Sequence, residues 1–334
     1  MSYAIDPALP PGLPGGHPGT VITVGTFDGV HRGHWEVLAA LRRCARRVGL
    51  PAVLVTFHPH PLRVVRPDQA PPLLTTPLEK KEILAESGLD YAVFIPFTHV
   101  LKAYSPRRFV EEILIGRLHM RHLVIGYDHG FGRGRSGDVD TLRVIGAELG
   151  FDVQVVEALT TDGDTISSTK IRRALEEGRV DEAALALGRP YSLRGPIVHG
   201  DGRGRALGFP TANIRVLDPD KMLPREGVYA VAGSLRGSRH PGVLHLGPRP
   251  TFRGSPPSVE LHLFDFDRDI YGEEVRVEFC AWLRGIHRFS TPDALVEAIR
   301  DDCAQALRLF DAGGTPCGPW SGRGAFGVVG ESGG

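Results

Sequence analysis

The sequence predicts an α/β fold with a parallel sheet in its first half and a mainly β fold in its second half. Strand-like apolar runs alternate with helical patterns up to about residue 187, and this alternation favours a parallel sheet covered by helices. From about Gly188, short β-like runs are broken by glycine and proline, which is typical of a small barrel or sandwich. The length of 334 residues also favours two domains over a single core.

The elements of the first half follow from hydrophobic periodicity. In the first helix expected in this half, Leu38, Leu41 and Ala45 share one face and the arginines lie largely on the opposite face. We interpret the arginine face as solvated. The expected strands are 21–24, 52–57, 91–95, 122–125 and 151–156, and the expected helices are 34–48, 77–86, 106–118, 138–149 and one that follows 165–169 and ends at 177.

The second half is expected to consist of short strands and one closing helix. Pro292 after Ser290 and Thr291 marks the start of this helix, because proline fits the first helical position. The ends of the chain show no periodicity, so 1–18 is expected to be a loose arm and 312–334 a disordered tail. The expected strands are 197–198, 227–231, 243–246, 259–263 and 275–279, and the domains are 19–187 and 188–311.

Composition excludes several classes of protein. The formal net charge is zero, so no global attraction to nucleic acid or to a membrane surface is expected. No apolar run reaches transmembrane length, and the first residues lack the pattern of a signal peptide. The four cysteines fit no metal or disulfide framework by their spacing, which predicts a reducing, cytoplasmic location. The sequence does not specify an oligomeric state.

The strongest functional signal is GTFDGVHRGH at 25–34, between an apolar strand and a helical pattern. A helix N-terminus offers unpaired N–H groups and a positive dipole end, and His31 and His34 could reach the same anion. Gly25, Gly29 and Gly33 would permit a close approach of the backbone. The alternative is a tight turn that carries two surface histidines. We interpret the stretch as a phosphate site.

Two later segments can be interpreted in a similar way. A formal G-x-G-x-x-G at Gly132, Gly134 and Gly137 lies several residues beyond the preceding strand and includes arginines. We therefore expect a mobile basic loop that meets phosphates and not a dinucleotide fingerprint. Consecutive hydroxyl residues at 167–169 precede a helix, where plain N-capping and phosphate binding are about equally plausible. Pairing with the turn at 25–34 would favour phosphate binding.

The motifs together resemble the bacterial bifunctional riboflavin kinase/FMN adenylyltransferase (FAD synthetase) family over roughly residues 20–310. Taken singly, the His-x-Gly-His pattern marks only a broad nucleotidyltransferase class. In the observed order the set is highly specific: GTFDGVHRGH at 25–34, TFHPHP at 56–61, GYDHGFG at 126–132, ISSTKIR at 166–172, LGRPY at 187–191, GDGRGR at 200–205, GFPTAN at 208–213, RPTF at 249–252 and VELH at 259–262.

The resemblance implies a Rossmann-like nucleotidyltransferase domain followed by a small antiparallel β-barrel kinase domain with a C-terminal helix. In the first domain the phosphate of FMN attacks the α-phosphorus of ATP and pyrophosphate leaves. The implied catalytic residues here are His31, His34 and Arg172. The implied ATP- and phosphate-binding residues are Gly25, Phe27, Asp28, Gly33, Ser168 and Thr169, and the implied flavin-binding residues are His58, Pro59, Asp128 and Phe131.

In the second domain the resemblance implies that ATP phosphorylates the ribityl hydroxyl of riboflavin. An alcohol is a weak nucleophile, so a carboxylate general base is expected, and Glu260 occupies the family position for it. Thr211 and Asn213 are the implied Mg²⁺ ligands, since this hard cation prefers oxygen. Arg284 is an implied flavin contact. The implied nucleotide loop contains Gly200, Gly202, Arg203 and Gly204.

The sequence departs from the family pattern at two places in the second half. His245 stands where the family commonly has asparagine, and the segment 285–289 lacks the acidic residue often found there. The full set of motifs still makes the leading hypothesis an enzyme that makes FMN and then FAD from the small-molecule substrates riboflavin, FMN and ATP. The alternatives are an adenylyltransferase with a catalytically weak or regulatory flavin-binding domain, and a flavin- or RNA-contacting regulator without turnover.

Overall fold

The computed structural model describes two compact units, residues 1–168 and 169–334, each of which is considered by itself. Several expectations lie outside the described residues: most of the arm at 1–18, Asp128, the loop residues Gly202 and Arg203, and most of the tail. The described residues are 13, 18–127, 130–132, 136–157, 159–161, 164–200, 204, 207–247, 258–313 and 317–318.

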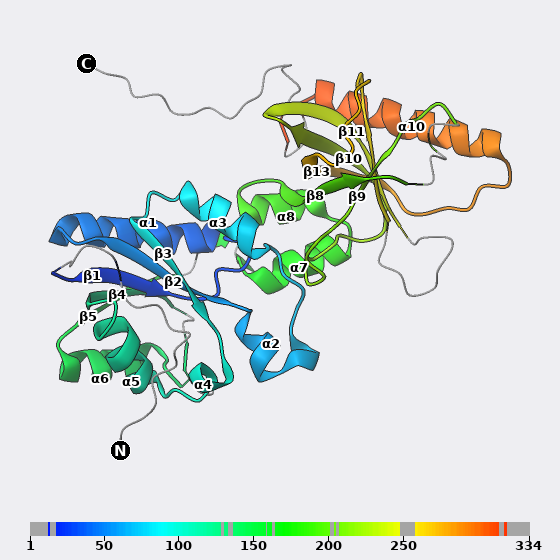
Figure 1. Cartoon of the computed structure of the whole chain (residues 1–334). Coiled ribbons are helices and arrows are strands. Elements are labelled where there is room, and N and C mark those ends of the chain that lie inside the picture. Colours follow the sequence, from blue (N-terminus) through cyan, green and yellow to red (C-terminus); the bar gives the residue numbers. More distant parts are fainter. Residues whose placement is uncertain are drawn as a thin grey trace, which may run out of the picture. The chain divides into compact units, whose positions relative to one another are not determined.

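A parallel sheet forms the centre of the first unit (Figure 1). Its strand order is β3-β2-β1-β4-β5, and every neighbouring pair is parallel, as the strand and helix alternation predicts. Parallel strands are buried on both faces, and every residue of β1 is buried here. The strands are β1 (Thr20–Val24), β2 (Ala52–His58), β3 (Tyr91–Pro96), β4 (Met120–Gly126) and β5 (Asp152–Val156).

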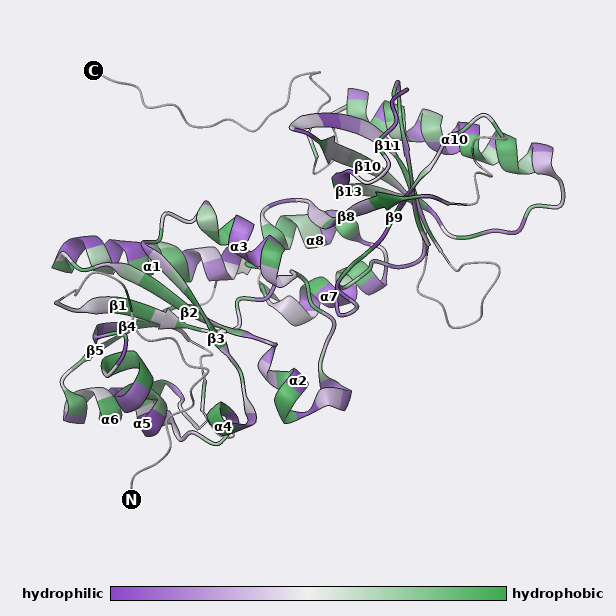
Figure 2. Cartoon of the chain, in the orientation of Figure 1, coloured by the Kyte–Doolittle hydropathy of each residue, from purple (hydrophilic) through white to green (hydrophobic). Residues whose placement is uncertain are grey.

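Helices cover both faces of this sheet. Alternate residues of β1 divide between them: Val21 packs with α1, whereas Ile22 packs with residues of α5 and α6. Figure 2 shows hydrophobic and hydrophilic residues alternating along α1, as a helix with one buried face requires. The elements are α1 (Arg32–Val48), α2 (Pro61–Val65), η1 (Pro67–Gln69), α3 (Pro77–Ala85), α4 (His99–Lys102), α5 (Pro106–Phe109), the π-helix η2 (Val110–Ile115) and α6 (Val139–Leu149), with a small ladder of β6 (Thr160–Thr161) and β7 (Asp164–Thr165).

The strands of the second unit form a closed antiparallel barrel. The short strands expected from the sequence were compatible with a barrel or a sandwich, and the structure shows the barrel. Its strand order is β10-β11-β12-β9-β8-β13. Tyr229 and Phe279 meet edge to face in the interior, with ring centroids 5.0 Å apart. The strands are β8 (Tyr191–Val198), β9 (Ala212–Ile214), β10 (Gly227–Leu235), β11 (Ser238–Gly247), β12 (Ser258–Leu263) and β13 (Glu274–Arg284), and the helices are α7 (Ser168–Glu176), α8 (Val180–Leu187) and α10 (Pro292–Asp311).

The long helix α10 packs on the outer surface of the barrel. Its Ala306 and Phe310 are buried against Ala230 and Ala232 of β10, so small strand residues let the helix approach closely. Thr291 caps the helix by accepting a hydrogen bond from the Ala294 N–H at 3.2 Å. The closing helix predicted to begin at Pro292 is therefore confirmed.

A disulfide between Cys280 and Cys317 corrects the expectation that the cysteines form no disulfide framework. The two Cα atoms are 5.4 Å apart, and both side chains are buried. Spacing alone gave no sign of the pair, because the residues are 37 apart and meet only when α10 returns the chain to β13. The disulfide fixes the chain to the barrel at Cys317, and the disorder expected for the rest of 312–334 stays a prediction. Cys44 and Cys303 are free thiols.

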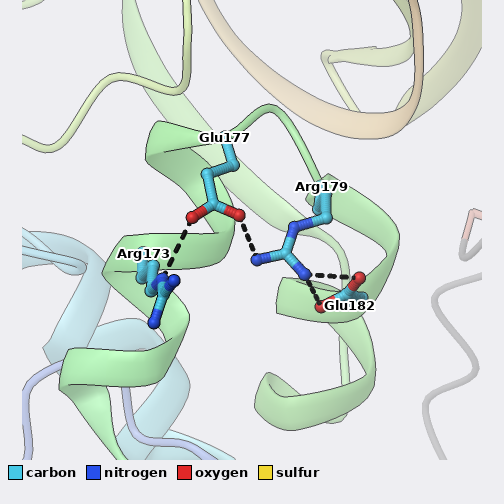
Figure 3. Close-up of polar contacts among 4 residues, drawn as sticks. All are labelled: Arg173, Glu177, Arg179 and Glu182. Atoms are coloured by element: carbon cyan, nitrogen blue, oxygen red, sulfur yellow. Dashed lines mark hydrogen bonds and ion pairs between the residues drawn. The ribbon is translucent and has the colours of Figure 1, made fainter.

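An exposed chain of ion pairs spans the turn between α7 and α8 (Figure 3). Glu177 pairs with Arg173 at 3.0 Å and also with Arg179, which in turn pairs with Glu182 at 2.7 Å. Each of the four side chains is at least 42% exposed, so water and salt screen these surface pairs strongly. The network therefore stabilises the turn only slightly.

The two units divide between residues 168 and 169, whereas the sequence led us to expect a domain boundary at 187/188. The helix α8 packs on β8 and β13 of the barrel, and the Arg225 N–H donates to the Leu175 carbonyl of α7 at 2.9 Å. Packing thus groups 169–187 with the barrel. The functional boundary at 187/188 stays a prediction.

Candidate active sites

Two histidines form the N-terminal cap of α1 at the carboxyl end of β1. The Nδ1 atom of His31 accepts a hydrogen bond from the His34 N–H, and the Nδ1 atom of His34 accepts one from the His31 N–H, each at 3.3 Å. The two rings are stacked, with centroids 3.6 Å apart. This arrangement is a capping box in which imidazoles replace the usual hydroxyl and carboxylate.

The cap fixes the chemistry that the two rings present. Since each Nδ1 accepts a backbone N–H, the proton of each neutral ring is assigned to Nε2, which makes Nε2–H a hydrogen-bond donor. The first turn of α1 contains no acidic residue, so no carboxylate there neutralises its positive end. The turn therefore combines two imidazole donors with an anion-attracting helix end.

Two residues of this turn adopt backbone conformations that are unusual for their types. Phe27 has φ of 46° and Val30 has φ of 41°, in the left-handed region that β-branched and bulky residues rarely occupy. Such strain persists only where surrounding contacts hold it. The Asp28 carboxylate supplies several, because it accepts the N–H groups of Leu74 and Thr75, both at 3.1 Å.

Asp28 is thus engaged with its own protein scaffold. It is 1% exposed and also accepts the Thr75 hydroxyl at 3.3 Å, while the same hydroxyl oxygen accepts the Gly29 N–H at 3.1 Å. The side chain ties the strained turn to residues 74–75. The contact of Asp28 with ATP or phosphate stays a prediction.

Lys80 is a neighbour of this turn that the sequence analysis missed. Its ammonium donates to the Thr26 carbonyl at 2.6 Å, and the Thr56 hydroxyl donates to the same oxygen at 3.0 Å. Lys80 is 7% exposed; burial lowers its pKa, and the nearby Asp28 charge opposes that shift. In the sequence, Lys80 is only a lysine one position after the capping-box Glu79 of α3, and nothing in this pattern indicates that it is buried.

The hydroxyl segment meets the histidine turn at Ser168, whose hydroxyl donates to the Asp28 carbonyl at 2.9 Å. At Gly33 an added Cβ would lie 3.3 Å from the His31 ring and 3.8 Å from the Ile166 carbonyl oxygen, so the two segments are close here too. Thr169 and Arg172 follow in α7, within the second unit. Their part in a shared site stays a prediction.

The residues expected to bind flavin in the first unit lie in different environments. His58 and Pro59, joined by a cis peptide bond, are exposed at the carboxyl end of β2, where ligands of open α/β sheets bind. Phe131 is only 9% exposed and packs against Phe109 in the core, with ring centroids 5.1 Å apart. The Phe131 ring therefore belongs to the core of the first unit, and its flavin contact stays a prediction.

On the barrel, strand register places the predicted kinase residues in one lateral row. Asn213 of β9 is opposite Glu260 of β12, and Glu260 is opposite His245 of β11. Beyond Val228 the row reaches Arg284 of β13 across an irregularity in the β10–β13 register. Directly opposed residues of antiparallel strands project from the same face. Because Val259 and Leu261 point into the barrel, Glu260 lies on its outer face.

Glycines bring a loop against the predicted metal ligands. A Cβ added at Gly200 would lie 2.0 Å from the Asn213 amide nitrogen, and one at Gly204 would lie 2.9 Å from the Thr211 hydroxyl. Hydroxyl and amide oxygens suit Mg²⁺, which usually keeps water and substrate phosphate in its shell. Within the described residues no group of three or more His, Cys, Asp or Glu side chains could hold a metal. The donors present fit Mg²⁺ shared with a nucleotide.

Arg284 is held by a partner that the sequence analysis missed. Its guanidinium donates to both carboxylate oxygens of Asp302 on α10, at 2.9 and 2.8 Å, and to the Gly285 carbonyl at 3.2 Å. Asp302 is 5% exposed, so this bidentate pair is largely shielded from water. The predicted flavin contact is therefore fixed in direction by α10. An acidic residue on the otherwise apolar face of that helix was the available signal.

Comparison with known proteins finds the same two modules in the same order. The model of the FAD synthetase family matches residues 14–170, and that of the riboflavin kinase family matches residues 187–310. The bifunctional riboflavin kinase/FMN adenylyltransferase of Bacillus subtilis (strain 168) is 37% identical over 296 residues, which cover 87% of this chain and 92% of that protein. The protein of the same name from Escherichia coli (strain K12) is 38% identical over 293 residues, which cover 87% and 93%.

A solved structure shares this architecture. The crystal structure of a macrolide-efflux protein from Streptococcus pneumoniae matches with a TM-score of 0.80 and 31% identity, covering 89% of this chain and 95% of that chain. Among the residues described here, no helix is both long and apolar enough to cross a membrane. The matches over both halves show that the chain belongs to the bifunctional riboflavin kinase/FMN adenylyltransferase family.

Proposed function

We propose that the first unit adenylylates FMN and that the barrel phosphorylates riboflavin, each at the site described above. The observation that supports this division best is the double histidine cap, because it presents two Nε2–H donors at a helix N-terminus. The lateral row of Asn213, Glu260 and Arg284 is its counterpart on the barrel. The substrates are ATP, riboflavin and FMN, and FAD is the final product.

In the adenylyl transfer, an FMN phosphate oxygen bonds to the α-phosphorus of ATP as the bond to pyrophosphate breaks. Such an in-line transfer needs positioning and charge stabilisation and no covalent enzyme intermediate. His31 and His34 donate to the ATP phosphates. Ser168, Thr169 and Arg172 stabilise the departing pyrophosphate, and Gly25 and Gly33 let the phosphates approach the backbone, with Phe27 and Asp28 maintaining the turn.

In the phosphorylation, Glu260 accepts the proton of the ribityl hydroxyl as its oxygen bonds to the γ-phosphorus and ADP leaves. Mg²⁺, held by Thr211 and Asn213, would neutralise phosphate charge when bound with the nucleotide. The loop with Gly200, Gly202, Arg203 and Gly204 covers the nucleotide. Flavin is contacted by Arg284 in the barrel and by His58, Pro59, Asp128 and Phe131 in the first unit.

The two reactions also bear on the surroundings of the enzyme. Both consume ATP, which supports a cytoplasmic location, although a disulfide such as Cys280–Cys317 is rare in a reducing cytoplasm. Zero formal net charge supports small-molecule partners over nucleic acid. An adenylyltransferase with a regulatory barrel is the second candidate, because the His245 position departs from the family pattern.

One assay separates these functions. The purified chain is incubated with riboflavin, ATP and Mg²⁺, and FMN and FAD are followed by chromatography. We expect both products, with H31A losing FAD but not FMN. E260A should lose FMN formation but still convert added FMN to FAD. FAD formed only from added FMN by the unsubstituted chain would favour the regulatory barrel, and joint loss of both activities in either variant would contradict two separate sites.

A further inference from the structure

His245 is the one titratable side chain that stands directly beside Glu260 in the lateral row of described strands. Strands β11 and β12 pair His245 with Glu260, so their Cβ atoms are expected about 4.5–5.5 Å apart on the same face of the barrel. The other neighbour of Glu260 in the row is Asn213. The base predicted for the kinase reaction is thus flanked by an amide on one side and an imidazole on the other.

The backbone beside His245 leaves room for its ring. A Cβ added at Gly247 would lie 2.8 Å from Cε1 and 3.1 Å from Nε2 of His245, so a side chain at 247 would displace the imidazole. The same Cβ would lie 3.3 Å from Ile286, so the ring and the loop after β13 share this space. His245 is therefore confined between the strand and this loop, close to the face that carries Glu260.

The surrounding charges define the state of the ring. Burial is the largest influence and lowers the pKa of His245; Arg284 acts in the same direction, and Glu260, Glu226 and Asp302 oppose it. The ring is accordingly neutral at pH 7, with one nitrogen that donates and one that accepts. A neutral ring can donate a hydrogen bond to the Glu260 carboxylate without forming an ion pair. An ion pair would reduce the basicity of the carboxylate.

We propose that His245 is a positioning residue for the kinase reaction, donating an imidazole N–H hydrogen bond that orients the Glu260 carboxylate toward the ribityl hydroxyl. The contact forms in the substrate complex, since hydrogen bonds in an active site often tighten only there. His245 itself does not touch substrate. The inference rests on the proposed role of Glu260 as the general base.

The test compares replacements that keep or remove the N–H group. H245L retains bulk without a donor, whereas H245N and H245Q each carry an amide N–H, at about the reach of Nδ1 and Nε2 respectively. H245L is expected to lower the kcat for riboflavin phosphorylation about tenfold, the order of one hydrogen bond to a charged group, with the KM for riboflavin within twofold. One of the two amide variants should recover most of the loss.

The controls separate this inference from the proposed function. H240Q replaces another histidine of β11 and should keep the unaltered kcat, and FAD formation from added FMN reports correct folding of the first unit in every variant. An H245L enzyme with unchanged kcat, or a loss that neither amide recovers, overturns the inference. So does a rise in KM alone, which would indicate direct flavin contact. If E260Q retains full kinase activity, the proposed base itself is wrong.

Discussion

The Lys80 ammonium lies 2.6 Å from the Thr26 carbonyl oxygen and holds the residue that precedes the strained Phe27. The Thr56 hydroxyl shares this acceptor, so a side chain of β2 and one of α3 converge beneath the histidine turn. A buried ammonium is costly unless it is hydrogen-bonded or lies near an opposite charge, and here Asp28 supplies that charge. The contact between Lys80 and Thr26 therefore connects the fold of the first unit to the shape of its phosphate turn.

Replacing Lys80 with methionine should reduce FAD formation. K80M keeps the length of the side chain but removes the charged donor, so the turn loses one contact that holds its left-handed residues. We expect the adenylyltransferase kcat/KM to fall about tenfold or more, since a hydrogen bond from a charged group contributes about 1.5–3 kcal/mol. Steady-state assays with added FMN measure it.

Lys81 provides a matched control for that experiment. It is the next residue of α3 but is exposed, so K81M should retain full adenylyltransferase activity. Riboflavin phosphorylation in K80M should equal that of the unsubstituted chain, because the barrel is a separate compact unit. Equal activities of K80M and K81M would show that the Thr26 contact has no part in catalysis.

Local pattern predicted most of the fold. The parallel sheet, the barrel strands β10, β11, β12 and β13, and α10 could be expected from their hydrophobic period. The same pattern left the choice between barrel and sandwich open, gave β8 only at 197–198 and did not predict α8. The short helices α2 and α4 and the three-residue strand β9 were missed, because such short segments complete no period. The π-helical continuation of α5 depends on packing that no local pattern encodes.

The site was predictable only where its chemistry is local. The histidine cap lies within a single motif, so its residues and its position before a helix follow from the sequence. The contacts of Lys80 with Thr26 and of Asp302 with Arg284 join residues far apart in the chain, and no spacing rule gives them. The pairing of His245 with Glu260 depends on strand register, and no local spacing in the sequence gives that register.

The Cys280–Cys317 disulfide should stabilise the barrel. A cross-link between residues 37 apart restricts the unfolded chain, and removing it is expected to lower the free energy of unfolding by about 4 kcal/mol. C317S should therefore unfold at lower denaturant than the oxidised unsubstituted chain, as followed by urea titration of the barrel transition. Reduced unsubstituted chain should behave like C317S.

C303S is the matched control, because Cys303 is a free thiol in the same hydrophobic cluster. It should leave the denaturation midpoint of the oxidised chain close to its original value. Thiol alkylation of the unreduced chain, analysed by mass spectrometry after unfolding, should label Cys44 and Cys303 alone. Labelling of all four cysteines would contradict the disulfide.

Acidification should destabilise the barrel partly through His245. Burial holds the pKa of His245 below its ordinary value of 6.5, so the unfolded chain binds a proton more readily than the folded chain in the interval between the two values. The contribution of the neutral His245 ring to barrel stability is therefore fully present above about pH 6.5 and decreases as the pH falls below that value.

H245N cannot take up this proton, so its barrel Tm should decrease less between pH 7.5 and 5.5 than that of the unsubstituted chain. His240, whose pKa is also lowered by burial, remains in both proteins and contributes equally. Parallel Tm profiles for the two proteins, measured by scanning calorimetry, would mean that His245 is protonated as easily in the folded barrel as in the unfolded chain.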